Sequence, residues 1–321
     1  MANTTTTQVS SAVNNFYDRV MLMRAVPAFV HTRWAQVRDI PKKSSEVIKF
    51  RRYGSLSAAT TALTEGLTPN GSQLSVTDVT ATVALYGDFV TLTDFLQMTT
   101  LDPLITEASE VLGEQAGNSL DQICRNVIRA GTTVQYASTS TTRLTVAAGM
   151  ILNGDEVREA VRTLDGNDAK RVTSQVNPSS GYNTSPIAPA YIGVITENSE
   201  YDLKADPDFV SVEEYSSSIA PLENEIGKLD KVRFIMSTNG SIFAAGGAGS
   251  IDVHGTLIIG KEAYGISRIS GEALRTIVKP LGSAGSEDPL DQRSTVGWKA
   301  SFVAVILNES FLLRIEHAVS A

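Results

Sequence analysis

The sequence predicts an α+β protein with one long helix, one extended β-hairpin and two groups of strands. Apolar residues recur every three or four positions from residue 102 to residue 130, which is typical of a helix. Two alternating segments flank a long polar stretch between residues 46 and 93, as in a hairpin. After residue 150, strand-length apolar runs alternate with short helical patterns and then continue without helices to the end. This mixture favours the α+β class over an all-α or all-β fold.

The composition is that of a globular chain. The 321 residues are 42% apolar and 19% charged, as expected for a protein with a sizeable core. No apolar run approaches the ~20 residues that span a bilayer, and the opening MANTTTTQVS lacks the pattern of a secretory signal. The single cysteine, Cys124, excludes an intrachain disulfide and is natural in a reducing compartment. We therefore expect no membrane partner.

Charge is distributed unevenly along the chain. Residues 1–52 contain nine basic and three acidic residues, a net +6, whereas the remainder contains 18 basic and 32 acidic residues, a net −14. A basic segment attached to an acidic body favours docking onto acidic surface, in another copy or in another molecule. A solvated surface with no partner is the alternative, because charge alone decides little.

Residues 1–45 form a predicted N-terminal arm. Residues 10–26 have the periodicity of an amphipathic helix. Pro27 limits that helix, and a connector containing Trp34 runs on to Pro41. We expect the arm to bury little within its own subunit.

Residues 46–93 form a predicted extended loop, built as a β-hairpin. The first strand, EVIKFRRY, carries Arg51 and Arg52, and residues 54–73 at the tip contain one charged residue, Glu65. The second strand alternates apolar and polar residues from Val79 to Leu85. Because an isolated two-stranded ribbon is marginal in water, we expect the hairpin to rest on another copy, with Arg51, Arg52 and Glu65 among the contacts.

The strongest local prediction is a helix over residues 102–130. Asp102 suits the N-cap, Pro103 the first helical position and Gly131 the position after the last turn. At 1.5 Å per residue the helix would be roughly 40 Å long. Cys124 lies inside it, and nothing nearby in the sequence indicates an activated thiol.

The rest of the chain predicts two further parts. Residues 151–274 alternate strands and short helices, which indicates an inserted α/β domain. Residues 275–321 are all strand-like and too short to fold alone. We expect them to pair with residues 85–93 and to pack under the long helix, so that residues 94–150 and 275–321 form one discontinuous domain.

No pattern for catalysis, a cofactor or a metal stands out. His31, His254 and His317 are far apart in sequence, which leaves metal binding only to convergence in space. The stretch GSAGSEDPLDQRSTVGWKA at 282–300 begins like a phosphate loop but has no following helix with a Lys. We interpret it as a surface loop in which Arg293 and Lys299 can pair with Glu287, Asp288 or Asp291, in this copy or in a neighbour. The sequence therefore predicts a non-enzymatic, self-assembling subunit without a cofactor.

This layout resembles the major capsid proteins of tailed bacteriophages. Several stretches are similar to the branch named after coliphage N-four: RAVPAFVH at 24–31, FRRYGSLSAATTALTEGLTP at 50–69, LGEQAGNSLD at 112–121, EIGKLDKVRF at 225–234 and residues 282–300. The resemblance implies a fold with an N-terminal arm (1–45), an extended loop (46–93), a peripheral domain with a spine helix (94–150 and 275–321) and an axial domain (151–274).

The resemblance also implies a function and partners. The chain would form hexamers and pentamers of itself in an icosahedral shell around double-stranded DNA, which it contacts non-specifically. A portal protein, a separate scaffolding protein and a decoration protein would be further partners, and assembly would occur in the host bacterial cytoplasm. The alternatives are a nanocompartment shell of the same fold that encloses protein cargo, and an enzyme whose site is dispersed in the sequence.

Overall fold

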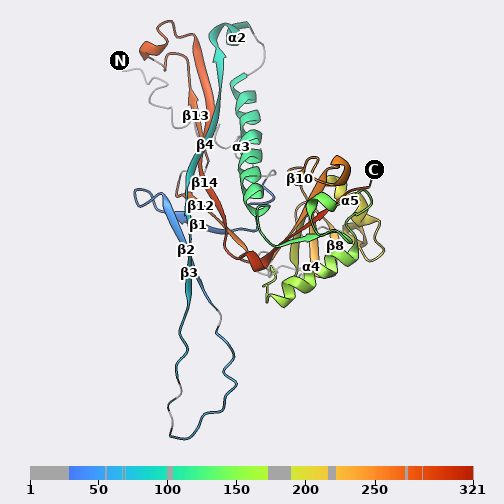
Figure 1. The fold of residues 1–321 in the computed structure, drawn as a ribbon. Helices are drawn as coiled ribbons and strands as arrows, with labels where there is room; N and C mark the ends of the chain where they lie inside the picture. The colour runs from blue at the N-terminus through green and yellow to red at the C-terminus, as the bar shows by residue number, and fades with distance from the viewer. Residues whose placement is uncertain are drawn as a thin grey trace.

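The computed structural model describes residues 29–320, apart from residues 55, 67, 69, 100–103, 173–188, 216–221, 272–273 and 284. Its parts are a long helix beside a sheet, a thin hairpin that projects away from the body, and a second sheet with its own helices (Figure 1). The mixed helix and sheet content confirms the predicted α+β class.

The first sheet has five strands centred on a single long one. Its members are β1 (Gln36–Ile40), β4 (Ala84–Thr93), β12 (Tyr264–Ile269), β13 (Arg275–Lys279) and β14 (Arg293–Ile306). The 14-residue β14 pairs with β4, β12 and β13, while β1 pairs in parallel with β12. The expected pairing of the segment after residue 292 with residues 85–93 is confirmed, in register from Arg293 opposite Thr93 to Phe302 opposite Ala84.

The long helix α3 (Leu104–Ile128) packs against this sheet. It buries one face, including Leu112, Ala116, Leu120 and Ile128. At the contact, Trp298 of β14 donates its indole N–H to Gln115 Oε1 at 3.1 Å. The short helix α2 (Asp94–Thr99) precedes α3 and buries none of its residues. The predicted helix over 102–130 is therefore confirmed from residue 104, the first described residue after a gap.

The second sheet has eight strands: β5 (Val134–Tyr136), β6 (Tyr191–Ile195), β7 (Val210–Ser211), β8 (Glu225–Leu229), β9 (Val232–Met236), β10 (Ser241–Phe243), β11 (Val253–Ile259) and β15 (Leu312–His317). Every residue of β6, β11 and β15 is buried, as expected for strands covered on both faces. Two helices accompany this sheet: α4 (Gly154–Gly166) and α5 (Glu197–Lys204).

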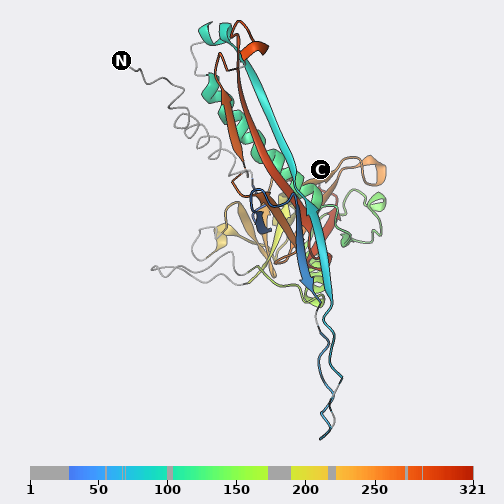
Figure 2. The same ribbon diagram turned by 90° about the vertical axis from the view of Figure 1, so that its left-hand side faces the viewer.

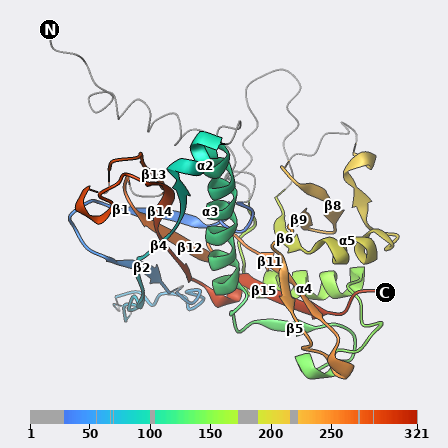
Figure 3. The ribbon, with the colours of Figure 1, turned by 90° about the horizontal axis from the view of Figure 1, so that it is seen from above.

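Two apolar clusters explain why both faces of β6 are buried. Tyr191 and Ile195 pack with residues of α4, whereas Ile192 and Val194 belong to the cluster that contains α3. Side chains on a strand alternate between faces, so one strand contributes to both cores. Seen from above, α3 stands between the two sheets (Figure 3).

The hairpin consists of β2 (Val47–Tyr53) and β3 (Val76–Thr82), which pair antiparallel only with each other. After β3, the chain passes through Val83 into β4 and so joins the first sheet. The hairpin continues the direction of β4 away from the body (Figure 2). The predicted second strand therefore divides in two, because residues from 84 onward find a better partner in β14.

Two expectations are wrong. Residues 312–317 do not pair with residues 85–93 but lie between β11 and β5 in the second sheet. The end of the predicted arm does not stay free of its own subunit either, because Val30, Trp34 and Ile40 are buried and residues 36–40 form β1. Residues 1–28, with the predicted helix at 10–26, lie outside the described residues.

Candidate assembly surfaces

The hairpin buries almost nothing within its own chain. Of its described strand residues only Phe50 and Ala81 are buried. Every described residue from 56 to 75 is exposed, including Leu63 at 77% and Leu74 at 63%. A ribbon of this size is marginally stable in water, and exposed apolar side chains on such a projection indicate a surface that another molecule covers.

The base of the hairpin is fixed to the body. Arg52 donates from Nη1 to Asn308 Oδ1 at 2.7 Å, next to the 3₁₀ turn η7 (Glu309–Phe311). The Phe50 ring packs so closely on Gly265 that a Cβ there would lie 3.1 Å from it. A groove of about 610 Å³ beside this contact is lined by residues of β2 together with Lys170, Asn308 and Phe311. The hairpin is therefore held at one end and free along the rest.

The predicted contact residues of the hairpin differ in what they touch. Arg51 Nε lies 3.3 Å from Asp78 Oδ1 on the facing strand, with 64% of its side chain exposed. Glu65 is exposed at the tip. Arg52 is used for the bond to Asn308, so Arg51 and Glu65 remain the more accessible of the three.

The other three predicted contact residues, Glu287, Asp288 and Arg293, lie in the loop before β14 and at the start of that strand. Asp288 is buried, and its Oδ2 accepts the backbone N–H of Arg293 at 2.8 Å. The Arg293 guanidinium donates to the Glu287 carbonyl at 2.9 Å and lies 3.7 Å from Asp288 Oδ2. The predicted pairing between Arg293 and Asp288 thus occurs within this copy. Among the described residues no group of three metal-ligating side chains forms, here or elsewhere.

The end of the first sheet beside this loop exposes apolar side chains. Phe95 and Met98 of α2 are 73% and 76% exposed, and Leu290 in the loop is 75% exposed. These two segments lie together at the end of the molecule opposite the hairpin (Figure 1). Each end of the long sheet therefore has an apolar surface that the chain itself does not cover.

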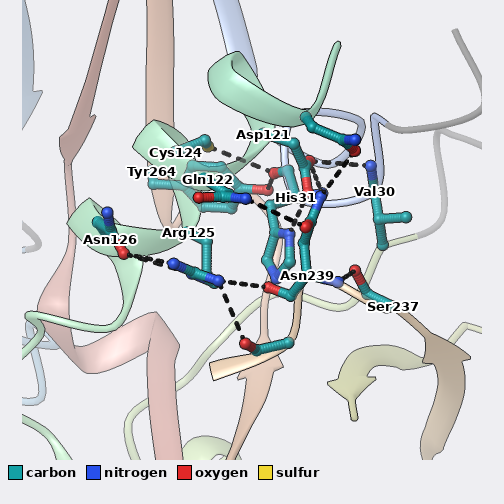
Figure 4. A network of polar contacts seen from close by, with 12 residues as sticks. Val30, His31, Asp121, Gln122, Cys124, Arg125, Asn126, Ser237, Asn239 and Tyr264 are labelled. Atoms are coloured by element: carbon teal, nitrogen blue, oxygen red, sulfur yellow. Dashed lines mark hydrogen bonds and ion pairs between the residues drawn. The ribbon is translucent and has the colours of Figure 1, made fainter. Parts of the chain in front are cut away.

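Between these ends, a buried polar network fixes the chain to α3 where the predicted arm enters the body. Asp121 of α3 accepts the backbone N–H groups of Val30 and His31 at 3.0 and 2.7 Å, and its Oδ2 lies 2.8 Å from His31 Nδ1. The Tyr264 hydroxyl and the Cys124 thiol both donate to the His31 carbonyl (Figure 4). Because His31 and Asp121 are completely buried, this contact is a firm anchor rather than a surface pairing.

The surroundings of Cys124 and Tyr264 keep both side chains protonated. Burial raises the pKa of the Cys124 thiol well above its usual value, and the Asp121 charge raises it further. Burial likewise raises the pKa of Tyr264. A thiol that stays protonated is a poor nucleophile, so the interpretation of Cys124 as inert agrees with its surroundings.

The sequence did not reveal that His254 and His317 are neighbours. They face each other across β11 and β15, with ring centroids 6.2 Å apart. Each ring bonds to a threonine, His254 Nδ1 to Thr196 Oγ1 at 2.8 Å and His317 Nε2 to Thr256 Oγ1 at 3.0 Å. Burial lowers the pKa of His254, and lowers that of His317 to about 4. The two histidines are neighbours because of the register between β11 and β15. Since 62 residues lie between them in the sequence, no short motif contains both.

Comparisons with known proteins agree with this arrangement. The sequence from residue 76 to residue 315 matches the phage capsid protein family. The chain belongs to that family. Among curated protein sequences, none matches this chain significantly.

Solved phage capsids have a similar fold at low sequence identity. The Cyanophage P-SCSP1u capsid is 15% identical, with a TM-score of 0.65 and coverage of 91% of this chain and 89% of the other. The Ralstonia phage GP4 capsid is 12% identical, with a TM-score of 0.68 and coverage of 91% and 90%. An encapsulin from Synechococcus elongatus, SrpI, is 8% identical, with a TM-score of 0.54 and coverage of 89% and 88%. The capsid protein thus has the fold of phage major capsid proteins and is a subunit of a phage shell. No helix among its described residues is long and apolar enough to cross a membrane.

Proposed function

We propose that this capsid protein assembles through hexamers and pentamers of itself into a closed icosahedral shell around the double-stranded DNA of a tailed phage. The observation that carries this proposal is the hairpin, which projects from the body with its apolar residues exposed. A symmetric shell supplies every subunit with a neighbour on which that hairpin can lie. The exposed apolar end formed by Phe95, Met98 and Leu290 gives a second surface for such contacts.

The division into four parts belongs to this proposal. The arm (1–45), the extended loop (46–93), the peripheral domain (94–150 with 275–321) and the axial domain (151–274) correspond to separate tasks in assembly. The first sheet with α3 supports the peripheral domain, and the second sheet with α4 supports the axial one. Strand β15 departs from this division because it completes the second sheet.

The six predicted contact residues remain proposals with unequal support. Arg51 and Glu65 are exposed on the hairpin and available to a neighbour. Arg293 keeps 52% of its side chain exposed while it pairs with Asp288. Arg52, Glu287 and Asp288 hold local structure in this copy, so their effect on a neighbour would be through positioning.

Further partners follow from the proposed shell. We propose a portal protein at one vertex, a separate scaffolding protein, a decoration protein on the outside and non-specific contact with packaged DNA, with assembly in the host bacterial cytoplasm. The stretches at 24–31, 50–69 and 282–300 support membership in the N-four-like branch.

The competing function is a nanocompartment shell, which the encapsulin likeness supports at the level of the fold. Both functions predict closed particles when the full chain is expressed, so electron microscopy of the purified protein tests the shell itself. The contents of particles from their natural source separate the two: nuclease-protected DNA supports the capsid, and a packaged enzyme supports the nanocompartment. An enzyme with a dispersed site would instead show catalytic activity in a broad hydrolase and transferase screen of subunits and particles.

A further inference from the structure

Three arginines surround one phenylalanine where the end of α3 meets the second sheet. The Cζ atoms of Arg143, Arg129 and Arg314 lie 3.5, 4.5 and 5.5 Å from the centre of the Phe243 ring. Arg143 begins the 3₁₀ turn η3 (Arg143–Thr145) and Arg129 directly follows α3, while Arg314 lies in β15 and Phe243 ends β10. Cations over an aromatic face are stabilised by the ring, but three of them together also repel one another.

Among the residues that the structure describes, one carboxylate balances these charges. Glu316, whose side chain is completely buried, accepts from Arg143 Nε at 2.8 Å and Nη2 at 2.7 Å. It also accepts from Arg314 Nε at 2.7 Å. Arg314 donates its remaining bonds to the carbonyls of Arg129 and Gly131 at the end of α3. Glu316 is thus fully used by two arginines.

Arg129 is left without an acidic partner among the described residues. The one described hydrogen bond of its side chain runs from Nη1 to the Ile242 carbonyl at 3.1 Å. Burial lowers the pKa of Arg129, and the charges of Arg143 and Arg314 lower it further, with Glu316 only partly opposing them. The site therefore has a surplus of positive charge on a body whose residues beyond 52 carry a net −14.

We propose that Arg129, supported by Arg143 at the edge of Phe243, binds a phosphate of a nucleic-acid backbone. The proposal rests on the proposed function, because a shell filled with DNA presents phosphates to every subunit. Arg129 keeps Nε and Nη2 free of described partners, and a guanidinium offers its donors as a fork that matches phosphate. Contacts to phosphate carry no sequence information, so this binding would not depend on the sequence of the nucleic acid. A carboxylate of a neighbouring subunit fits the same fork and is the competing occupant.

The test measures binding of a short labelled DNA duplex to the unassembled full chain by fluorescence anisotropy, at several salt concentrations. The variants are Arg129→Gln, Arg129→Lys and the control Arg162→Gln, an exposed arginine of α4 whose nearest acid is Glu159 at 3.8 Å. Loss of one phosphate contact lowers the slope of log affinity against log salt by about 1. We expect that reduction for Arg129→Gln, a retained slope with weaker binding for Arg129→Lys, and no change for Arg162→Gln.

Equal slopes for wild type and Arg129→Gln would overturn the proposal. Normal DNA binding by Arg129→Gln combined with loss of closed particles would also overturn it and would assign the site to a neighbour's carboxylate. If thermal melting shows Arg129→Gln unfolded, the affinity of Arg129→Lys relative to Arg162→Gln decides. Particle formation by the wild type is scored separately by electron microscopy, so failure of the proposed shell cannot be mistaken for failure of this site.

Discussion

Two β ribbons of this capsid protein have similar ladders but different surroundings. Strands β4 and β14 pair over ten residue pairs, and β2 and β3 over seven. Behind the first ribbon lies α3, and β14 buries Val296, Trp298 and Phe302. The second ribbon touches the described body only near its base, and only Phe50 and Ala81 are buried among its described strand residues. Ladder hydrogen bonds exchange with bonds to water and contribute little net stability. The first ribbon is therefore stabilised by its own subunit, whereas the second needs another molecule.

The largest expected effect comes from removing the hairpin tip. Deletion of residues 55–72 takes away a segment whose described residues are all exposed. The monomer should therefore keep its unfolding midpoint, while closed particles should disappear. Thermal unfolding and negative-stain electron microscopy measure the two outcomes on the same preparation. Closed particles of normal size from the shortened chain would show that the hairpin is not an assembly element.

A matched pair of leucine truncations sharpens the comparison. Leu120 of α3 is 4% exposed and packs behind the first ribbon, whereas Leu63 on the hairpin is 77% exposed. Leu120→Ala should lower the free energy of unfolding by about 2–5 kcal/mol, the cost of an internal cavity. Leu63→Ala should change it by less than about 0.5 kcal/mol and should instead reduce particle yield. Denaturant titration of the unassembled chain gives both values, and a similar loss for the two variants would contradict the comparison.

The body of the protein should also lose stability in acid, because it buries His317. Burial and, to a smaller extent, the charge of the stacked His254 lower the pKa of His317 to about 4, although the Ala318 carbonyl and Asp202 oppose the shift. The unfolded chain, with an ordinary pKa near ~6.5, binds more protons than the folded chain between these values. The free energy of unfolding is therefore highest above pH ~6.5 and falls as the pH drops toward ~4, by roughly 3 kcal/mol for this residue.

His317→Gln tests that dependence because glutamine does not titrate. Denaturant titrations at several pH values between about 7 and 4 should show a much weaker dependence for this variant. His254→Gln should remove a smaller part, since its imidazole is also shifted downward. A His317→Gln chain that loses stability with acid as steeply as the wild type would assign the effect to other groups.

The sequence predicts local elements of the fold better than the partners of each strand. The spacing of apolar residues places α3 correctly, because a helix face depends only on residues three and four apart. The tail strand β15 is misplaced because LLRIEH looks half-polar, although its Arg314 and Glu316 are buried in a pairing with Arg143. Strand β1 is missed because its parallel partner β12 lies more than 200 residues away.

For the assembly surfaces too, the sequence predicts local features but not contacts between distant residues. The hairpin and its exposed tip are predicted, since long polar segments between two alternating ones are visible in one sequence. The His254–His317 pair and the arginines around Phe243 depend on register and on contacts between distant elements. No spacing rule connects such residues, so they become visible only in three dimensions.

The smallest expected effect on monomer stability concerns Arg51. Its substitution distinguishes a role in assembly from a role in folding. Its pairing with Asp78 at 3.3 Å is largely exposed, and exposed pairs contribute about 0.2–1 kcal/mol. Arg51→Gln should therefore leave monomer stability nearly unchanged. If Arg51 meets acidic surface on a neighbour, this variant should assemble poorly, and wild-type assembly should weaken as salt shortens the screening distance below ~8 Å.

Arg162→Gln removes the same charge from α4, where 83% of the side chain is exposed, and serves as the control. Light scattering during assembly compares the three proteins, and equal yields for both variants would show that Arg51 has no specific role between subunits.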